Sequence, residues 1–251
     1  MANSINTNAG ALVALQNLNA TSRDLNVTQN RVNTGLKISS AKDNGAIFAI
    51  ATAQRAEMGA QDAVKQSLQR GQSIVDVALS AGETVTNAMN ELKSLAVAIQ
   101  DAAPLSDTAN KLNADFSALV AEIKTSLADA KFDGVNLYAA NAAAIDVTTN
   151  TSGGKFTLKS PVTAAAGAYV VGGLIDPTQG AAGAVPATEP AFDLDTLAHR
   201  TAANVERAIA NFSTVLADLG TKSKSLDRQL TFTSKMQDAL EVGIGNLVDA
   251  D

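Results

Sequence analysis

Few side chains in this chain could take part in catalysis or hold a metal ion. The sequence contains no cysteine and a single histidine, His199. Thiolates and imidazoles supply most nucleophiles, general bases and zinc ligands. Thiolate sites are therefore excluded, and an imidazole site could use His199 alone. No potential ligand stands at a suitable spacing from His199, which we interpret as a surface or packing residue beside Arg200. The sequence therefore predicts a protein that is not an enzyme and has no catalytic, metal or cofactor site.

Two short patterns are similar to ligand-binding motifs but have simpler interpretations. Asp193 and Asp195 could form a calcium ligand pair, yet helix capping by one of them explains the pattern with fewer assumptions. Gly243 and Gly245 lack the preceding strand and the third glycine of a phosphate-binding loop, so we interpret them as a flexible position. Neither pattern changes the prediction.

The composition favours packed helices and disfavours several classes of partner. Hydrophobic residues make up 46% of the chain but aromatic residues only 4%. Small aliphatic side chains suit helices that pack side by side, whereas ligand pockets and base-stacking surfaces use aromatic rings. The net charge of −6 disfavours nucleic acids and anionic membranes as partners. No apolar run approaches the roughly 20 residues that span a bilayer.

Apolar periodicity predicts the helices that must organise this chain. We expect a first helix over about 11–36 with a weak stripe at every seventh residue, a second over about 46–101, a third from about 107, and a last one that begins after residue 193. Pro104 separates the second and third helices. The expected capping residues are Ser40 or Asp43 for the second helix, Ser106 or Asp107 for the third, and Asp193 or Asp195 for the last.

Three of these helices carry an apolar stripe whose spacing of three and four residues is typical of a coiled-coil seam. In the second helix the stripe is Ile74, Ala78, Ala81, Val85, Ala88, Leu92, Leu95 and Ile99. In the third it is Leu112, Phe116, Leu119, Ile123, Leu127 and Ala130. In the last it is Val205, Ile209, Phe212, Leu216, Leu219, Ser223, Leu226, Leu230, Thr233, Gln237, Leu240, Ile244 and Leu247. A seam of this length must pack against the earlier helices.

Between residues 131 and 190 the pattern changes to short β-branched runs separated by glycine and proline. We expect strands at 145–149 and 155–159 and a loop at 179–190. The predicted fold is therefore mainly α. Long antiparallel helices form a coiled-coil-like rod or bundle, and a small β-rich segment of hairpins lies between the third and fourth helices.

Two groups of residues resemble the signatures of bacterial flagellins. One group reads SINTN at residues 4–8, RVNTGLKI at 31–38 and SAKDN at 40–44, and the other reads FDGVNL at 132–137, where the family usually has F-N-G-x-N-L. The signature positions are Arg31, Gly35, Lys37, Ser40, Ala41, Asp43, Phe132, Gly134, Asn136 and Leu137. The resemblance covers residues 1–137 and 194–251 and leaves the segment between them unmatched.

This resemblance implies a structural subunit that polymerises into the flagellar filament for motility. It implies an inner filament and export segment at 1–44, a helical rod domain at 45–131 and 193–251, and a variable surface segment at 132–192. The implied partners are other flagellin subunits, an export chaperone and hook-associated proteins. The implied location is the extracellular flagellum, reached without a cleaved signal peptide. Flagellins end in a further helix that pairs with the first one, and the resemblance implies that this helix is missing after Asp251 and that the sequence is truncated, processed or partial.

One alternative function remains open from the sequence. The same fold could serve as a cell-surface binding protein whose segment 140–190 recognises a polysaccharide or a host molecule. Phe156, Tyr169 and Phe192 are the candidate stacking residues.

A second departure from the family concerns innate immunity. In many flagellins a Toll-like receptor recognises a helical patch of the R-x-x-E-L-A type. The equivalent positions here are Glu91, Leu92, Lys93, Ser94, Leu95 and Ala96. Glu91 stands where the arginine falls and Ser94 where the glutamate falls, so the resemblance implies weak receptor contact.

Overall fold

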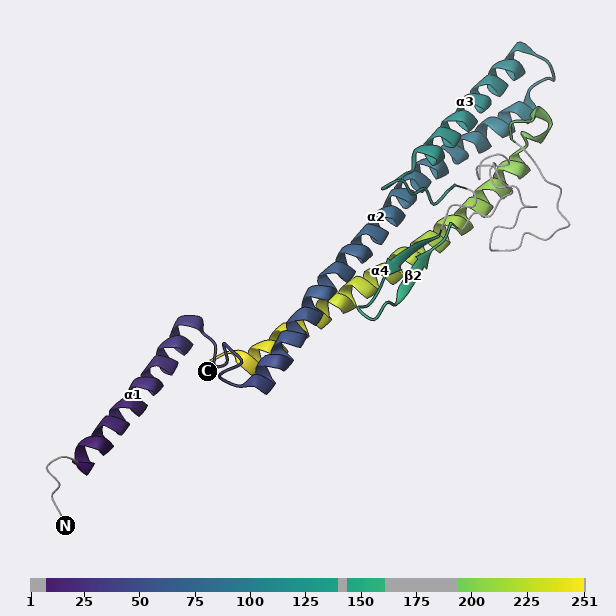
Figure 1. The fold of residues 1–251 in the computed structure, drawn as a ribbon. Coiled ribbons are helices and arrows are strands. Elements are labelled where there is room, and N and C mark those ends of the chain that lie inside the picture. The colour runs from purple at the N-terminus through teal and green to yellow at the C-terminus, as the bar shows by residue number, and fades with distance from the viewer. Residues whose placement is uncertain (1–7, 140–143, 161–193, 251) are drawn as a thin grey trace. The chain divides into compact units, whose positions relative to one another are not determined.

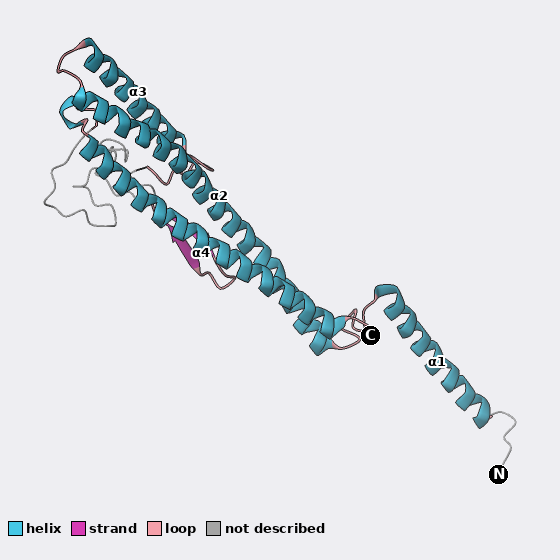
Figure 2. Ribbon diagram, turned by 180° about the vertical axis from the view of Figure 1, so that it is seen from behind, coloured by secondary structure: helices cyan, strands magenta, loops and turns pink. Residues whose placement is uncertain are grey.

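A computed structural model describes residues 8–139, 144–160 and 194–250 (Figure 1). Within them lie the α-helices α1 (Ala9–Thr34), α2 (Gly45–Asp101), α3 (Asp107–Asp129) and α4 (Ala202–Val248), the short 3-10 helix η1 (Leu197–His199), and the strands β1 (Ile145–Thr148) and β2 (Lys155–Leu158). Helices dominate, and the predicted mainly α class is confirmed (Figure 2).

The chain divides into two compact units. The first consists of Met1–Asp62 with Ser234–Asp251, and the second is Ala63–Thr233. In the second unit α3 and α4 lie alongside α2 in both ribbon views (Figures 1 and 2). Its core contains buried side chains from all three helices, and Val147 and Leu158 of the strands complete it.

The two strands form an antiparallel hairpin at the predicted position. Ile145 pairs with Leu158 and Thr148 with Lys155. Alternate side chains point into the core, so Val147 and Leu158 are buried while Asp146 stays exposed. The expected loop at 179–190 lies outside the described residues.

Helix caps agree with the sequence at one of three positions. The side chain of Ser106 accepts a hydrogen bond from the Ala109 N–H at 3.1 Å and caps α3 as predicted. At α2 the prediction of Ser40 or Asp43 is wrong, because Asn44 Oδ1 accepts from the N–H groups of Ala46 and Ile47 at 3.1 Å each.

The predicted cap of the last helix is also wrong. Its start lies later in the chain than expected, and Thr201 Oγ1 accepts from the Asn204 N–H at 3.2 Å. Asp195 instead forms an ion pair with Lys124 of α3, and Asp193 lies outside the described residues. His199 belongs to η1, before α4 begins.

The most buried stripe of α2 differs from the predicted seam. It repeats at steps of three and four residues and shares Ala78, Val85 and Leu92 with the predicted set, but its other members are Val64, Leu68, Gly71, Val75, Gly82, Met89 and Ala96. The predicted residues Ala81, Ala88, Leu95 and Ile99 are only half-buried. Hydrophobicity alone missed this stripe because two of its positions are glycine.

Both glycines allow another element to approach α2 closely. A Cβ at Gly71 would lie 2.7 Å from Val147 Cγ2 of the hairpin. A Cβ at Gly82 would lie 2.2 Å from Leu216 Cδ2 and 2.6 Å from Tyr138 Oη. The glycines weaken the isolated helix by about 1 kcal/mol each, and close packing in the second unit offsets that loss.

Candidate functional site

The first unit contains a long helix, α1, that the other described residues leave uncovered. None of the residues of α1 is buried. Seven large apolar side chains of this helix are between 42% and 78% exposed: Leu12, Val13, Leu15, Leu18, Leu25, Val27 and Val32. Helices gain most of their stability in proteins from packing of an apolar face. A series of exposed leucines and valines on one helix marks a surface that contacts another molecule.

Local sequence explains both ends of α1. Asn8 Oδ1 accepts a hydrogen bond from the Ala11 N–H at 3.2 Å. At the other end Gly35 adopts φ 67°, and its N–H donates to the Arg31 carbonyl at 2.8 Å. Glycine tolerates this left-handed conformation. The signature positions Arg31 and Gly35 therefore terminate the helix.

The segment after α1 pairs with the end of α4 in the same unit. Lys37 N–H and Ile38 N–H donate to the Val248 carbonyl at 2.7 and 3.2 Å, and Ala250 N–H donates to the Gly35 carbonyl at 3.0 Å. Ile38 is only 7% exposed. These bonds satisfy backbone groups that the last turn of a helix leaves without intrahelical partners.

A small apolar core supports this pairing. Ala51 of α2 packs with Ile244 and Val248 of α4, and Leu36, Met58 and Leu247 cover the cluster. The first unit thus has a packed part, built from α2, α4 and residues 36–38, and an uncovered part, α1.

Asp43 organises the loop between α1 and α2. One oxygen, Oδ2, accepts hydrogen bonds from the N–H groups of Ser39 and Ser40 at 3.0 and 2.9 Å and from both hydroxyls. The backbone bonds from Ser40 and Ser39 favour the carboxylate and lower the pKa of Asp43. The signature residues Ser40 and Asp43 therefore fix a turn, while Ala41 is exposed.

The second signature forms a tight turn in the other unit. Phe132 and Val135 exchange backbone hydrogen bonds of 3.0 and 2.9 Å, while Asp133 and Gly134 adopt φ of 50° and 76°. Asn136 Nδ2 donates to the Leu127 carbonyl at 2.7 Å, near the end of α3. The turn has a structural role, since it closes the C-terminal end of α3.

Tyr138, just after this signature, is a functional packing residue that the sequence did not identify. It is 1% exposed, and its hydroxyl donates to the Ala78 carbonyl of α2 at 2.5 Å. Its ring stacks on Phe212 at 5.7 Å between centroids. Burial raises the pKa of Tyr138 far above its ordinary value.

The sequence did not identify the structural role of Arg200 either. Only 6% of it is exposed, and its guanidinium lies 5.2 Å from the centre of the Phe116 ring. Its nitrogens donate to the carbonyl oxygens of Leu194, Asp195 and Asn113 at 3.1, 3.0 and 2.8 Å. Arg200 therefore ties the chain before α4 to α3. The sequence offered only its position beside the single histidine.

The receptor-patch equivalents do not all face solvent. Glu91 and Ser94 are exposed, Leu92 and Ala96 are buried, and Leu95 is half-buried. Lys93 forms an ion pair of 2.8 Å with Glu206 of α4. Glu91 and Ser94, the two positions that depart from the R-x-x-E-L-A pattern, are therefore exposed on this stretch of α2, and the Lys93 side chain remains 44% exposed.

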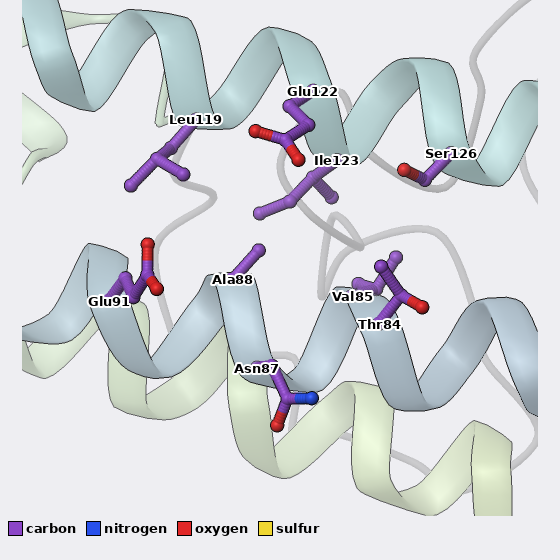
Figure 3. A pocket seen from close by; sticks show the side chains of 9 residues that line it. All are labelled: Thr84, Val85, Asn87, Ala88, Glu91, Leu119, Glu122, Ile123 and Ser126. Atoms are coloured by element: carbon purple, nitrogen blue, oxygen red, sulfur yellow. The ribbon is translucent and has the colours of Figure 1, made fainter.

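A shallow hollow of about 190 Å³ lies between α2 and α3 beside Glu91. Figure 3 shows Ala88 and Ile123 facing each other across it, with Glu91 and Glu122 at its polar edge. Among the described residues no cluster of histidine or acidic side chains has the arrangement needed to hold a metal ion. Over the same part of the chain, every helix falls short of the length and apolarity that crossing a membrane requires.

The remaining predicted seam residues all lose solvent contact to some degree. Phe116, Phe212, Leu219 and Leu226 are at most 1% exposed. Leu112, Leu119, Leu216, Leu230 and Leu240 are half-buried. The structure brings Phe116, Phe212, Leu219 and Leu226 into one core, whereas Leu240 lies on the part of α4 that belongs to the first unit.

The family model and the relatives of similar sequence agree on one family. The family model described as "Bacterial flagellin N-terminal helical region" matches residues 5–143. Flagellin FljM of Caulobacter vibrioides is 43% identical over 249 residues, which cover 99% of this chain and 85% of that protein. A flagellin of Brucella melitensis is 35% identical over 256 residues, covering 99% of this chain and 86% of that protein. The crystal structure of Bacillus cereus flagellin aligns with a TM-score of 0.41 at 16% identity, over 70% of this chain and 88% of that one.

Proposed function

Because the chain belongs to the bacterial flagellin family, we propose that the exposed apolar face of α1 is the surface that neighbouring subunits cover in the filament. Flagellins are structural subunits of the extracellular flagellar filament, so this protein is a filament subunit and not an enzyme. Its function is motility through polymerisation with other flagellin subunits.

The single observation that carries the proposal is the exposure of the large apolar residues of α1. All seven large apolar residues of α1 are at least 42% exposed. Burial of one Leu or Val side chain contributes roughly 1.5 to 3 kcal/mol. Coverage of this face by neighbouring copies therefore supplies a strong driving force for assembly, and the inner segment 1–44 is the assembly part of the subunit.

Electron microscopy after addition of a polymerising salt tests the proposal on the chain extended after Asp251 by the terminal helix of a flagellin, because the family resemblance implies that this helix pairs with α1. We expect this extended wild-type chain to form filaments and its double variant Leu18→Gln, Leu25→Gln to stay monomeric, because glutamine at these positions removes the apolar contact. Gln16→Ala with Asn30→Ala is the matched control on polar positions of the same helix. Circular dichroism should show the same unfolding midpoint for all three monomers. Normal filaments from the leucine variant would contradict the proposal.

Export and partner binding extend the proposal. We propose that the flagellar export apparatus also recognises segment 1–44 and that this segment is not cleaved. We further propose that an export chaperone and hook-associated proteins bind the chain. An uncovered apolar helix offers these proteins a surface before assembly. Mass spectrometry of the secreted protein should find residues 1–44 intact.

We further propose that the chain contacts Toll-like receptors weakly. On the stretch 91–96, Glu91 and Ser94 are exposed and both differ from the recognised motif. In a receptor reporter assay the double variant Glu91→Arg, Ser94→Glu should signal at least tenfold more strongly than wild type. Equal potency of the wild type and a standard agonist would refute this.

The alternative of a polysaccharide-binding surface protein is not favoured. The flagellin relatives match nearly the whole chain, and the described residues of segment 140–190 place Phe156 half-buried against the core. Tyr169 and Phe192 lie outside the described residues.

A further inference from the structure

The loop that joins α2 to α3 holds an exposed leucine in an unfavourable backbone conformation. Leu105 is 92% exposed, and its φ of 62° lies in the left-handed region. Among the residues that the structure describes, Asp133 is the only other non-glycine residue with positive φ. Aspartate enters this region readily, whereas leucine is strained there. The backbone at residue 105 thus favours glycine or asparagine over the leucine that it carries.

The start of α3 does not use this leucine. Leu105 directly precedes Ser106, the cap of α3. A hydrophobic residue at this position normally packs against the fourth residue of the helix, which here is the exposed polar residue Asn110. With 92% of Leu105 exposed, no such contact covers it. The ordinary structural role of a hydrophobic residue before a helix cap is therefore excluded.

The neighbours of Leu105 extend the apolar surface. Ala103 and Pro104 are also exposed, and together residues 103–105 form what we term the hairpin tip. Proline restricts its own φ, so the tip is less flexible than a glycine loop of the same length. A rigid apolar projection with backbone strain is suited to insertion into a concave surface.

We propose that the hairpin tip is a contact surface for a second copy of this chain, with Leu105 buried by the neighbouring subunit. The inference rests on the filament function proposed above. An open helical polymer requires two different surfaces that meet on adjacent copies. In such a polymer every subunit repeats the contact, so the local strain at Leu105 is offset once per subunit. The isolated subunit gains nothing from the leucine.

Substitutions at Leu105 separate assembly from stability. Leu105→Asn and Leu105→Gly keep the backbone conformation, so the thermal unfolding midpoint of the monomer should stay the same or rise. The critical concentration for filament growth should rise about tenfold, equivalent to about 1.4 kcal/mol at 25 °C. Leu197→Asn is the matched control, since Leu197 is 68% exposed but lies in η1 without positive φ. It should leave the critical concentration unchanged.

A chemical readout tests burial directly. The chain has no cysteine, so Leu105→Cys introduces a single thiol. A maleimide should label it at least tenfold more slowly in filaments than in monomers. Failure of the wild-type chain, extended after Asp251 by the terminal helix of a flagellin, to form filaments would contradict the proposed function. Equal critical concentrations for wild type and Leu105→Asn, or equal labelling rates in monomer and filament, would overturn the tip contact alone and leave the filament function intact.

Discussion

Two helices of this protein repeat apolar residues at the same spacing but differ in what covers them. In α1 the residues Ala11, Leu18, Leu25 and Val32 recur every seventh position and all are exposed. In α2 the residues Leu68, Val75, Gly82, Met89 and Ala96 recur at the same interval and all are buried. An amphipathic period shows that a face is made for burial. The period does not show whether the same chain or another copy buries that face.

Burial decides how much stability is lost when a large apolar side chain is removed. Phe212→Ala removes a fully buried ring that stacks on Tyr138 and should lower the free energy of unfolding by about 3 to 5 kcal/mol. Leu18→Ala should change it by less than about 0.5 kcal/mol, since exposed positions contribute little. Urea unfolding followed by circular dichroism measures both. A large effect at Leu18 would mean that α1 is covered within the subunit.

A pair of glycines in α2 sharpens the comparison. Gly82→Ala should destabilise the protein by about 1 to 3 kcal/mol, because the added methyl meets Leu216 and Tyr138. Gly59→Ala has no atom within 4 Å of the new Cβ and should stabilise the helix by roughly 0.5 to 1 kcal/mol. Thermal unfolding of the two variants should therefore move in opposite directions. If both variants are more stable than wild type, the close contact of Gly82 with Leu216 and Tyr138 is contradicted.

The smallest expected effect concerns the loop beside α1. The pKa of Asp43 is lower in the folded chain than the ordinary value near 3.9, so its stabilising effect is complete above about pH 4. It is lost as the pH falls through the lower folded-state pKa. Asp43→Asn should therefore be slightly less stable than wild type at pH 7, and the difference should shrink as the pH falls through the lowered pKa of Asp43. A difference that persists or grows on acidification would show that the carboxylate does not organise this loop.

Local signals predicted the elements better than their boundaries. The hairpin strands and the Ser106 cap follow directly from residue type, because the β-branched runs and the serine act within a few residues. The caps of α2 and α4 were missed because Asn44 and Thr201 compete with nearby serines and aspartates of similar capping strength. Asp195 turned out to pair with Lys124, a partner 71 residues away.

The two candidate contact surfaces, on α1 and at Leu105, also differ in how much of them the sequence reveals. The stripe of α1 was visible in the sequence, but its exposure was not, because periodicity does not identify a cover. Leu105 carries no sequence signal at all. Its backbone angle and its exposure emerge only once α2 and α3 are joined.

The sequence by itself determined the helical class, the family signatures and the absence of cysteine chemistry, since these depend on residue types and on spacing along the chain. The tertiary structure decided which stripe of α2 is buried, because Gly71 and Gly82 contribute close approach rather than hydrophobicity. It also decided the roles of Arg200 and Tyr138, whose hydrogen-bond acceptors lie on other elements. Side chains that act through distant partners acquire their function only when folding brings those partners into contact.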